Sequence, residues 1–140
     1  VGDGPDRRVL EDKARALKVE ELVRFAGYTS NAAVQIGQHR AYIHVATLES
    51  FGITLIEAMA RGRPVFAAPV GGVPEVLGDG AAGLALPLSD AKAAARIVVD
   101  AMCDPDWMAA AGSAARQRFL REYESDIAAR RLEQFLVSFG

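Results

Sequence analysis

The stretch ESFGITLIEAMARGRPVFAAPVGGVPEV, Glu49 to Val76, decides the fold, because polar and helix-forming apolar residues are interleaved there more densely than elsewhere in the chain. Residues 53–60 predict a helix with a mostly buried surface. Gly52 directly precedes this helix and lets the backbone approach another group closely. The first turn of a helix presents unpaired N–H groups and a partial positive charge, so this turn is a candidate anion site.

Two carboxylates flank that turn, Glu49 before it and Glu57 within the helix, with seven residues between them. Eight residues of helix rise roughly 12 Å, about two turns. A carboxylate is repelled by a phosphate, so both side chains are better suited to accept hydrogen bonds from hydroxyl groups on either side of the anion. A ligand with a hydroxyl-rich end, a diphosphate and a ribose diol fits these features. The alternative is that Glu57 lies on a solvated stripe and pairs with Arg61 at i+4.

ESFGITLIEAMARGRPV followed by GGVPEVLGDGAAG resembles the donor-binding domain of retaining GT-B glycosyltransferases, the family 4 or group 1 enzymes. The resemblance implies an α/β fold, a Rossmann-like parallel sheet with helices on both faces that forms the second half of a GT-B fold. It implies that residues 1–140 are one nucleotide-sugar-binding domain, truncated at its N-terminus. The first strand, the family's upstream Arg and Lys, and an N-terminal acceptor-binding domain are then expected outside this chain.

The resemblance also implies roles for individual residues. Glu49 would be the catalytic residue in contact with the transferred sugar, the N–H groups of residues 52–54 would hold the diphosphate, and Glu57 would bind the ribose hydroxyls. Gly71 and Gly72 would form a close-approach loop on the far side of the donor. The expected substrate-binding residues are Ser50, Phe51, Gly52, Ile53, Thr54, Glu57, Gly27, Tyr28, Thr29, Gly71 and Gly72.

The loop Gly27, Tyr28 and Thr29 enters this set because residues 21–26 predict a strand. Ligands of open α/β sheets bind off the carboxyl ends of strands, so the loop is a candidate site for the nucleotide base. The alternative is a simple connection whose Ser30 caps the next helix. Before this strand, Val1 is expected to end a strand and Pro5 to occupy the first position of a helix. Arg7 and Arg8 are expected on the solvated face of that helix.

The remaining pattern alternates strands and helices, which predicts a parallel sheet covered on both faces. Further strands are expected at 42–46, 64–68 and 83–86, and further helices at 31–41, 89–103, 105–119 and from 125 onward. His39 and His44 are interpreted as surface or packed residues, Cys103 as a buried thiol and Trp107 as part of the core. The last helix carries an apolar stripe suited to contact with another domain or a second copy, formed by Ala128, Leu132, Phe135, Leu136 and Phe139.

Composition limits the class of protein. The chain has 140 residues, 51% hydrophobic and 24% charged, with a net charge of −2, as in a globular domain without an electrostatic sign of nucleic-acid binding. No apolar run approaches the roughly 20 residues of a membrane span, so we expect a cytoplasmic protein, at most peripheral to a membrane. No spacing typical of a metal site occurs, and neither a metal nor a cofactor is expected.

These observations predict the donor-binding part of an enzyme that transfers a hexose from a nucleoside-diphosphate sugar to an acceptor with retention. The N–H groups of the helix would stabilise the departing nucleoside diphosphate, and this chain alone would not turn over. The first alternative is a degenerate or non-catalytic nucleotide-sugar-binding module. The second is a nucleotide-sugar epimerase of similar architecture, which the ESFG to EAMA pattern disfavours.

Overall fold

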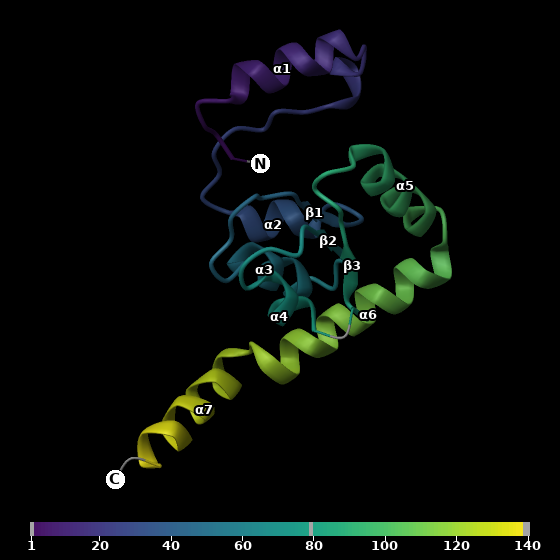
Figure 1. Ribbon diagram of the computed structural model, residues 1–140. Coiled ribbons are helices and arrows are strands. Elements are labelled where there is room, and N and C mark those ends of the chain that lie inside the picture. Colours follow the sequence, from purple (N-terminus) through teal and green to yellow (C-terminus); the bar gives the residue numbers. More distant parts are fainter. Residues whose placement is uncertain (1, 79, 139–140) are drawn as a thin grey trace.

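A computed structural model describes residues 2–78 and 80–138. Its centre is a parallel sheet of three strands, β1 (Tyr42–His44), β2 (Val65–Ala67) and β3 (Gly83–Ala85), in the order β1-β2-β3. Helix α3 (Ile53–Ala60) connects β1 to β2, and the short α4 (Val73–Leu77) connects β2 to β3 (Figure 1). Because the strands are parallel, their carboxyl ends share one edge of the sheet. The predicted α/β fold and parallel sheet are confirmed.

The other helices are α1 (Arg7–Ala16), η1 (Glu20–Leu22), α2 (Ala32–Gly37), α5 (Ala91–Met102), α6 (Pro105–Glu122) and α7 (Ser125–Val137). Two of them start at aspartates whose carboxylates accept backbone N–H groups of the first turn. Asp90 caps α5 and Asp104 caps α6, each with two bonds of 3.0 Å. These capping bonds explain why the starts of α5 and α6 can be predicted from the sequence.

Strand β2 is buried throughout and divides the core between the two faces of the sheet. Val65 and Ala67 belong to a cluster formed with residues of α2, α3, α4 and α6. Phe66, which points to the opposite face, packs with α5 and with the start of α6. Its ring lies 5.7 Å from that of Trp107, so Trp107 is a core residue as expected. Helices therefore cover both faces of β2.

The predicted strand at residues 21–26 is wrong. Glu20–Leu22 forms a turn of 3₁₀ helix, and residues 23–26 continue without strand pairing. The isolated bridge between Gly2 and Gly27 is the pairing that the structure describes beside this segment. A strand exists only where a neighbour takes up its backbone hydrogen bonds, and β1 pairs with β2 instead.

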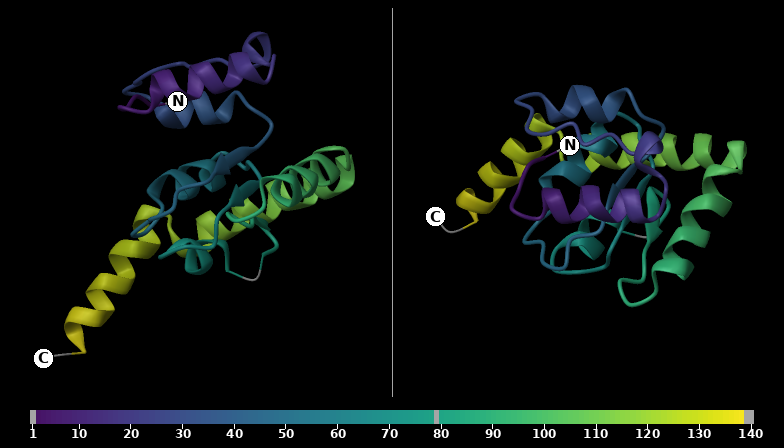
Figure 2. Two further views of the ribbon diagram at one scale, coloured as in Figure 1. Left: turned by 45° about the horizontal axis from the view of Figure 1, so that its top comes forward. Right: turned by 90° about the horizontal axis from the view of Figure 1, so that it is seen from above.

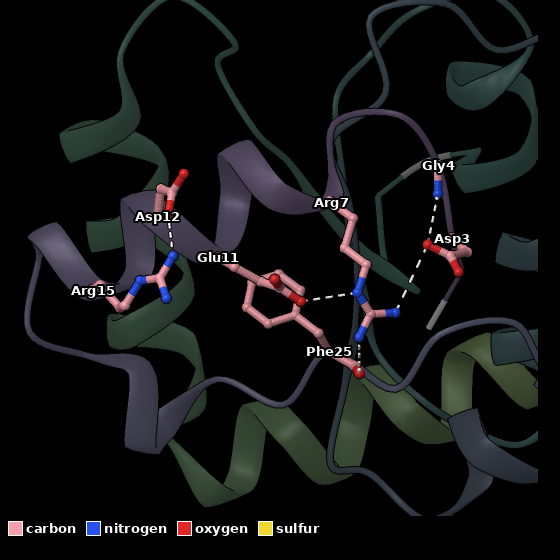
Figure 3. A network of polar contacts seen from close by, with 7 residues as sticks. All are labelled: Asp3, Gly4, Arg7, Glu11, Asp12, Arg15 and Phe25. Atoms are coloured by element: carbon pink, nitrogen blue, oxygen red, sulfur yellow. Dashed lines mark hydrogen bonds and ion pairs between the residues drawn. The ribbon is translucent and has the colours of Figure 1, made fainter.

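Residues 2–31 form a unit that stands apart from the sheet, as Figure 1 and the left view of Figure 2 show for α1. Pro5 lies one residue before the N-cap Asp6 rather than in the first turn, and Val1 lies outside the described residues. Arg7 does not point freely into solvent. Its guanidinium donates to Glu11 and to the carbonyl of Phe25, and it also faces Asp3 (Figure 3). Glu11 accordingly raises the pKa of Arg7, and Asp3 adds to the effect.

Two further expectations concern the C-terminal half. Cys103 is exposed rather than buried, because it follows the last residue of α5 and lies outside both core clusters. The apolar stripe of α7 is exposed as expected, with Leu132, Phe135 and Leu136 each more than half accessible, whereas Phe139 lies outside the described residues. Within the part of the chain that is described, no helix combines the length and apolar character needed to cross a membrane.

Candidate functional site

The start of α3 lies at the carboxyl edge of the sheet, directly after the loop that follows β1. Gly52 is the N-cap and adopts a left-handed conformation with φ 89°, which only glycine takes up without strain. The helix begins at Ile53 as the sequence predicts. The first N–H groups that bond within it are those of Leu55 and Ile56, which both donate to the carbonyl of Gly52. Among the described residues, the N–H groups of Ile53 and Thr54 have no hydrogen-bond partner. Two donors therefore remain free at the positive end of the helix.

Glu49 is held by three hydrogen bonds. Its Oε1 accepts from the backbone N–H of Phe51 (3.3 Å) and Gly52 (3.0 Å), and its Oε2 lies 3.0 Å from Nε2 of His44. The N–H of Phe51, more than those of Gly52 and the nearby His44, lowers the pKa of this carboxyl, while burial opposes the effect. The carboxylate is thus ionised and fixed in orientation. It also uses the N–H of Gly52, one of the three groups expected to face an anion.

Glu57 differs from Glu49 in having no hydrogen bond or ion pair with any residue that the structure describes. The alternative pairing of Glu57 with Arg61 is therefore not formed. The half-buried Glu57 lies near Tyr42, whose pKa is raised first by burial and then by the charges of Glu57 and Glu49. The charges of both carboxylates therefore raise the pKa of the same group, the hydroxyl of Tyr42 on β1.

Gly71 and Gly72 pack against the backbone of the Glu49 loop, residues 49–51. A Cβ atom on Gly71 would lie 1.6 Å from the carbonyl oxygen of Glu49, and one on Gly72 would lie 2.6 Å from that of Ser50. The N–H of Gly72 donates to the Glu49 carbonyl at 3.3 Å. In this structure the group that approaches these glycines is the backbone of residues 49–51, and their approach to a donor stays a prediction.

A cavity of about 560 Å³ opens between α2 and β1. Its lining includes Gln35 and His39 of α2, Tyr42 and His44 of β1, and Thr54 in the free first turn of α3. The loop at 27–29 does not line it: Tyr28 is 82% exposed. Thr29 instead accepts the N–H of Asn31, and Asn31, not Ser30, caps α2.

His44 is the site residue that the sequence interpretation missed. It lies inside the apolar run YIHVA, where a histidine is usually a packing residue, yet its ring contacts the carboxylate of Glu49. A signal was present, since a polar residue at the end of a buried parallel strand points to the edge where ligands bind. His39, by contrast, bonds to the carbonyl of Gln35 on its own helix. Over residues 2–78 and 80–138, no cluster of three or more metal-binding side chains occurs.

The same fold is found in solved structures of GT-B glycosyltransferases. Sucrose-phosphate synthase of Thermosynechococcus elongatus is 28% identical with a TM-score of 0.83, and the match covers 99% of this chain and 37% of that one. Anabaena HepE, solved in complex with UDP and glucose, has a TM-score of 0.87 over 98% of this chain and 39% of its own. At 23% identity, the second likeness concerns the fold alone.

The family follows from the sequence match. The family model described as glycosyl transferases group 1 matches residues 1–118, and the chain belongs to this family. N-acetyl-alpha-D-glucosaminyl L-malate synthase of Bacillus anthracis is 30% identical over 126 residues, which are 90% of this chain and 33% of that protein. D-inositol 3-phosphate glycosyltransferase of Streptomyces scabiei is 46% identical over 108 residues, 76% of this chain and 24% of that protein. The chain thus spans a third or less of the length of these two relatives.

Proposed function

We propose that this chain is the donor-binding, C-terminal half of a retaining glycosyltransferase that transfers a hexose from a nucleoside-diphosphate sugar to an acceptor. The observation that carries the proposal is the start of α3, where the free N–H groups of Ile53 and Thr54 lie between Glu49 and Glu57. A free anion site with a carboxylate on each side suits a diphosphate that has hydroxyl groups at both ends.

The proposed reaction depends on stabilising the leaving group. Negative charge grows on the β-phosphate as its bond to the sugar breaks, and the two free N–H groups, with the partial charge of the helix, stabilise that charge. The donors are fixed in advance by the left-handed Gly52, so they need no reorganisation as the charge develops. The proposed chemistry uses no cofactor, because both the electrophile and the leaving group belong to the donor substrate.

The two glutamates are assigned different ends of the donor. Glu49, fixed beside the start of α3, accepts hydrogen bonds from hydroxyls of the transferred sugar. Glu57, which has no partner among the described residues, accepts them from the ribose diol. An ionised carboxylate accepts at both oxygens, so each glutamate can bind two neighbouring hydroxyls.

The acceptor site is assigned to a part of the full-length enzyme that this chain does not contain. The match covers about a third of the relatives' length, which supports the proposal that residues 1–140 are one nucleotide-sugar-binding domain beside an acceptor-binding N-terminal domain. HepE, which shares the fold, was solved with UDP and glucose, so nucleotide sugars are the ligands to test first. This chain alone is expected to bind the donor without transferring the sugar.

Ligand-observed NMR tests the assignment with UDP-, GDP- and ADP-sugars at high concentration. Saturation transfer to one nucleotide class is expected, and Glu57→Ala should weaken binding by about 1.5–3 kcal/mol because a charged acceptor of hydroxyl groups is lost. Glu133→Ala, a charge removed from the exposed face of α7, is the matched control and should bind like the native chain. Equal binding by the native chain and Glu57→Ala would refute the role of Glu57, and no transfer to any sugar nucleotide would refute donor binding by this chain.

A further inference from the structure

His44 and Glu49 form a contact that joins a strand to the catalytic loop. His44 is the last residue of β1 and its side chain is 16% exposed, while that of Glu49 is 24% exposed. The N–H groups of Phe51 and Gly52 hold only the Oε1 atom of Glu49. The imidazole holds the other oxygen at 3.0 Å, so without His44 the carboxylate would be held at one oxygen alone and its plane would be less tightly fixed.

His44 is itself held in place. Its Nδ1 lies 3.4 Å from the hydroxyl of Tyr42, and the two rings are stacked with centroids 6.0 Å apart. Tyr42 is half-buried; burial raises the pKa of its hydroxyl, and Thr54 in the first turn of α3 lowers it. Polar contacts therefore run from Tyr42 through His44 to Glu49.

The chemistry of these polar groups determines which atom carries the proton in each contact. An ionised carboxylate only accepts, so Nε2 of His44 must carry a proton and donate it to Glu49. In the neutral ring Nδ1 then accepts, and the donor is the hydroxyl of Tyr42. Both ring nitrogens of His44 then have a partner of the opposite kind, which is the arrangement that holds a side chain in one orientation.

We infer that His44 is a positioning residue, which orients the carboxylate of Glu49 toward the hydroxyls of the donor's sugar. The inference rests on the proposed function in that it assigns Glu49 to the sugar end of the donor. Glu49 binds no other side chain of the described residues, so removal of the imidazole leaves Oε2 without its partner. Three other titratable groups lie near the imidazole. Tyr42 contacts it, Glu57 lies near Tyr42, and His39 lines the same cavity.

The test compares a sugar nucleotide with the same nucleotide lacking the sugar, using UDP-glucose with UDP and GDP-mannose with GDP. In His44→Leu the affinity for the sugar nucleotide that binds should fall roughly threefold to tenfold, while that for the nucleotide should stay unchanged. His44→Gln keeps an N–H donor and should restore most of the difference. An unchanged ratio of the two affinities in a folded His44→Leu chain would overturn the inference.

NMR of the side chains separates this inference from the proposed function. The carboxyl ¹³C signal of Glu49 should titrate at higher pH in His44→Leu than in the native chain, because a donor to the carboxylate is lost. In the native chain, the imidazole ¹⁵N signals should place the proton of neutral His44 on Nε2. The substitution Glu49→Gln should shift these ¹⁵N signals, because the partner of Nε2 changes. A native chain that binds no sugar nucleotide would refute the function but leave these readouts intact. A proton on Nδ1, or a Glu49 titration that His44→Leu leaves unchanged, would refute the inference alone.

Discussion

Residues 42–86 and residues 2–31 both contain a helix with apolar residues at helical spacing, but the two regions differ in how they are held. The first region contains the three strands, α3 and α4, and most of the fully buried side chains. In the second region Ala14 is the buried apolar residue that the structure describes, at 6% exposure. The hydrogen bonds described for residues 2–27 also stay within that segment. The candidate site belongs to the first region, where backbone contacts fix each turn.

The difference shows what an apolar stripe does and does not predict. Leu10 in α1 and Leu17 at its C-terminal cap recur at helical spacing, as apolar residues of α3 do, and the helix forms as expected. The same two leucines are nevertheless 51% and 62% exposed. A periodic pattern therefore predicts a helix and the face that would be buried, whereas burial depends on a neighbour elsewhere in the chain.

Two glycines test this comparison with the largest expected effect. Gly71→Ala would place a Cβ atom 1.6 Å from the Glu49 carbonyl, at a residue with φ 52°, so the loop at 49–52 must move. The free energy of unfolding should fall by more than about 3 kcal/mol, and donor binding should be lost. Denaturant unfolding followed by circular dichroism measures the change. Gly4→Ala is the control, since nothing lies within 4 Å of its Cβ position, and a similar loss there would contradict the comparison.

Two leucines provide the next test. Leu55 is 0% exposed in the core beneath the first turn of α3, whereas Leu10 of α1 is 51% exposed. Leu55→Ala leaves a cavity and should cost about 2–5 kcal/mol in urea unfolding. Leu10→Ala removes a side chain that is already half in water and should cost less than about 1 kcal/mol. If both substitutions destabilise the chain equally, α1 is packed as tightly as α3 and the distinction between the regions is lost.

The sequence was sufficient for the elements whose determinants are local. Residues 53–60 were expected as a helix and are helix α3, because Gly52 and the apolar spacing act within one turn. Asp90 and Asp104 likewise cap the helices that follow them. The segment at 21–26 was misassigned because a strand depends on a partner that its own residues do not reveal. The contact of His44 with Glu49 was missed for a related reason: it joins a strand to a loop through a backbone path set by Gly71 and Gly72.

Two arginines give the smallest effect and separate the regions by their hydrogen bonds. Arg118 of α6 donates to the carbonyls of Val76 (2.8 Å) and Glu75 (2.7 Å), so it joins α6 to the end of α4. Arg118→Gln should lower the free energy of unfolding by about 1 kcal/mol, because carbonyl groups lose a charged donor. Arg7 makes as many contacts, but all of them lie within residues 3–25 (Figure 3). Arg7→Gln should therefore leave the unfolding midpoint unchanged and speed amide hydrogen exchange only in α1 and the residues beside it. A shift of the midpoint by Arg7→Gln as large as that by Arg118→Gln would mean that residues 2–31 unfold together with the sheet.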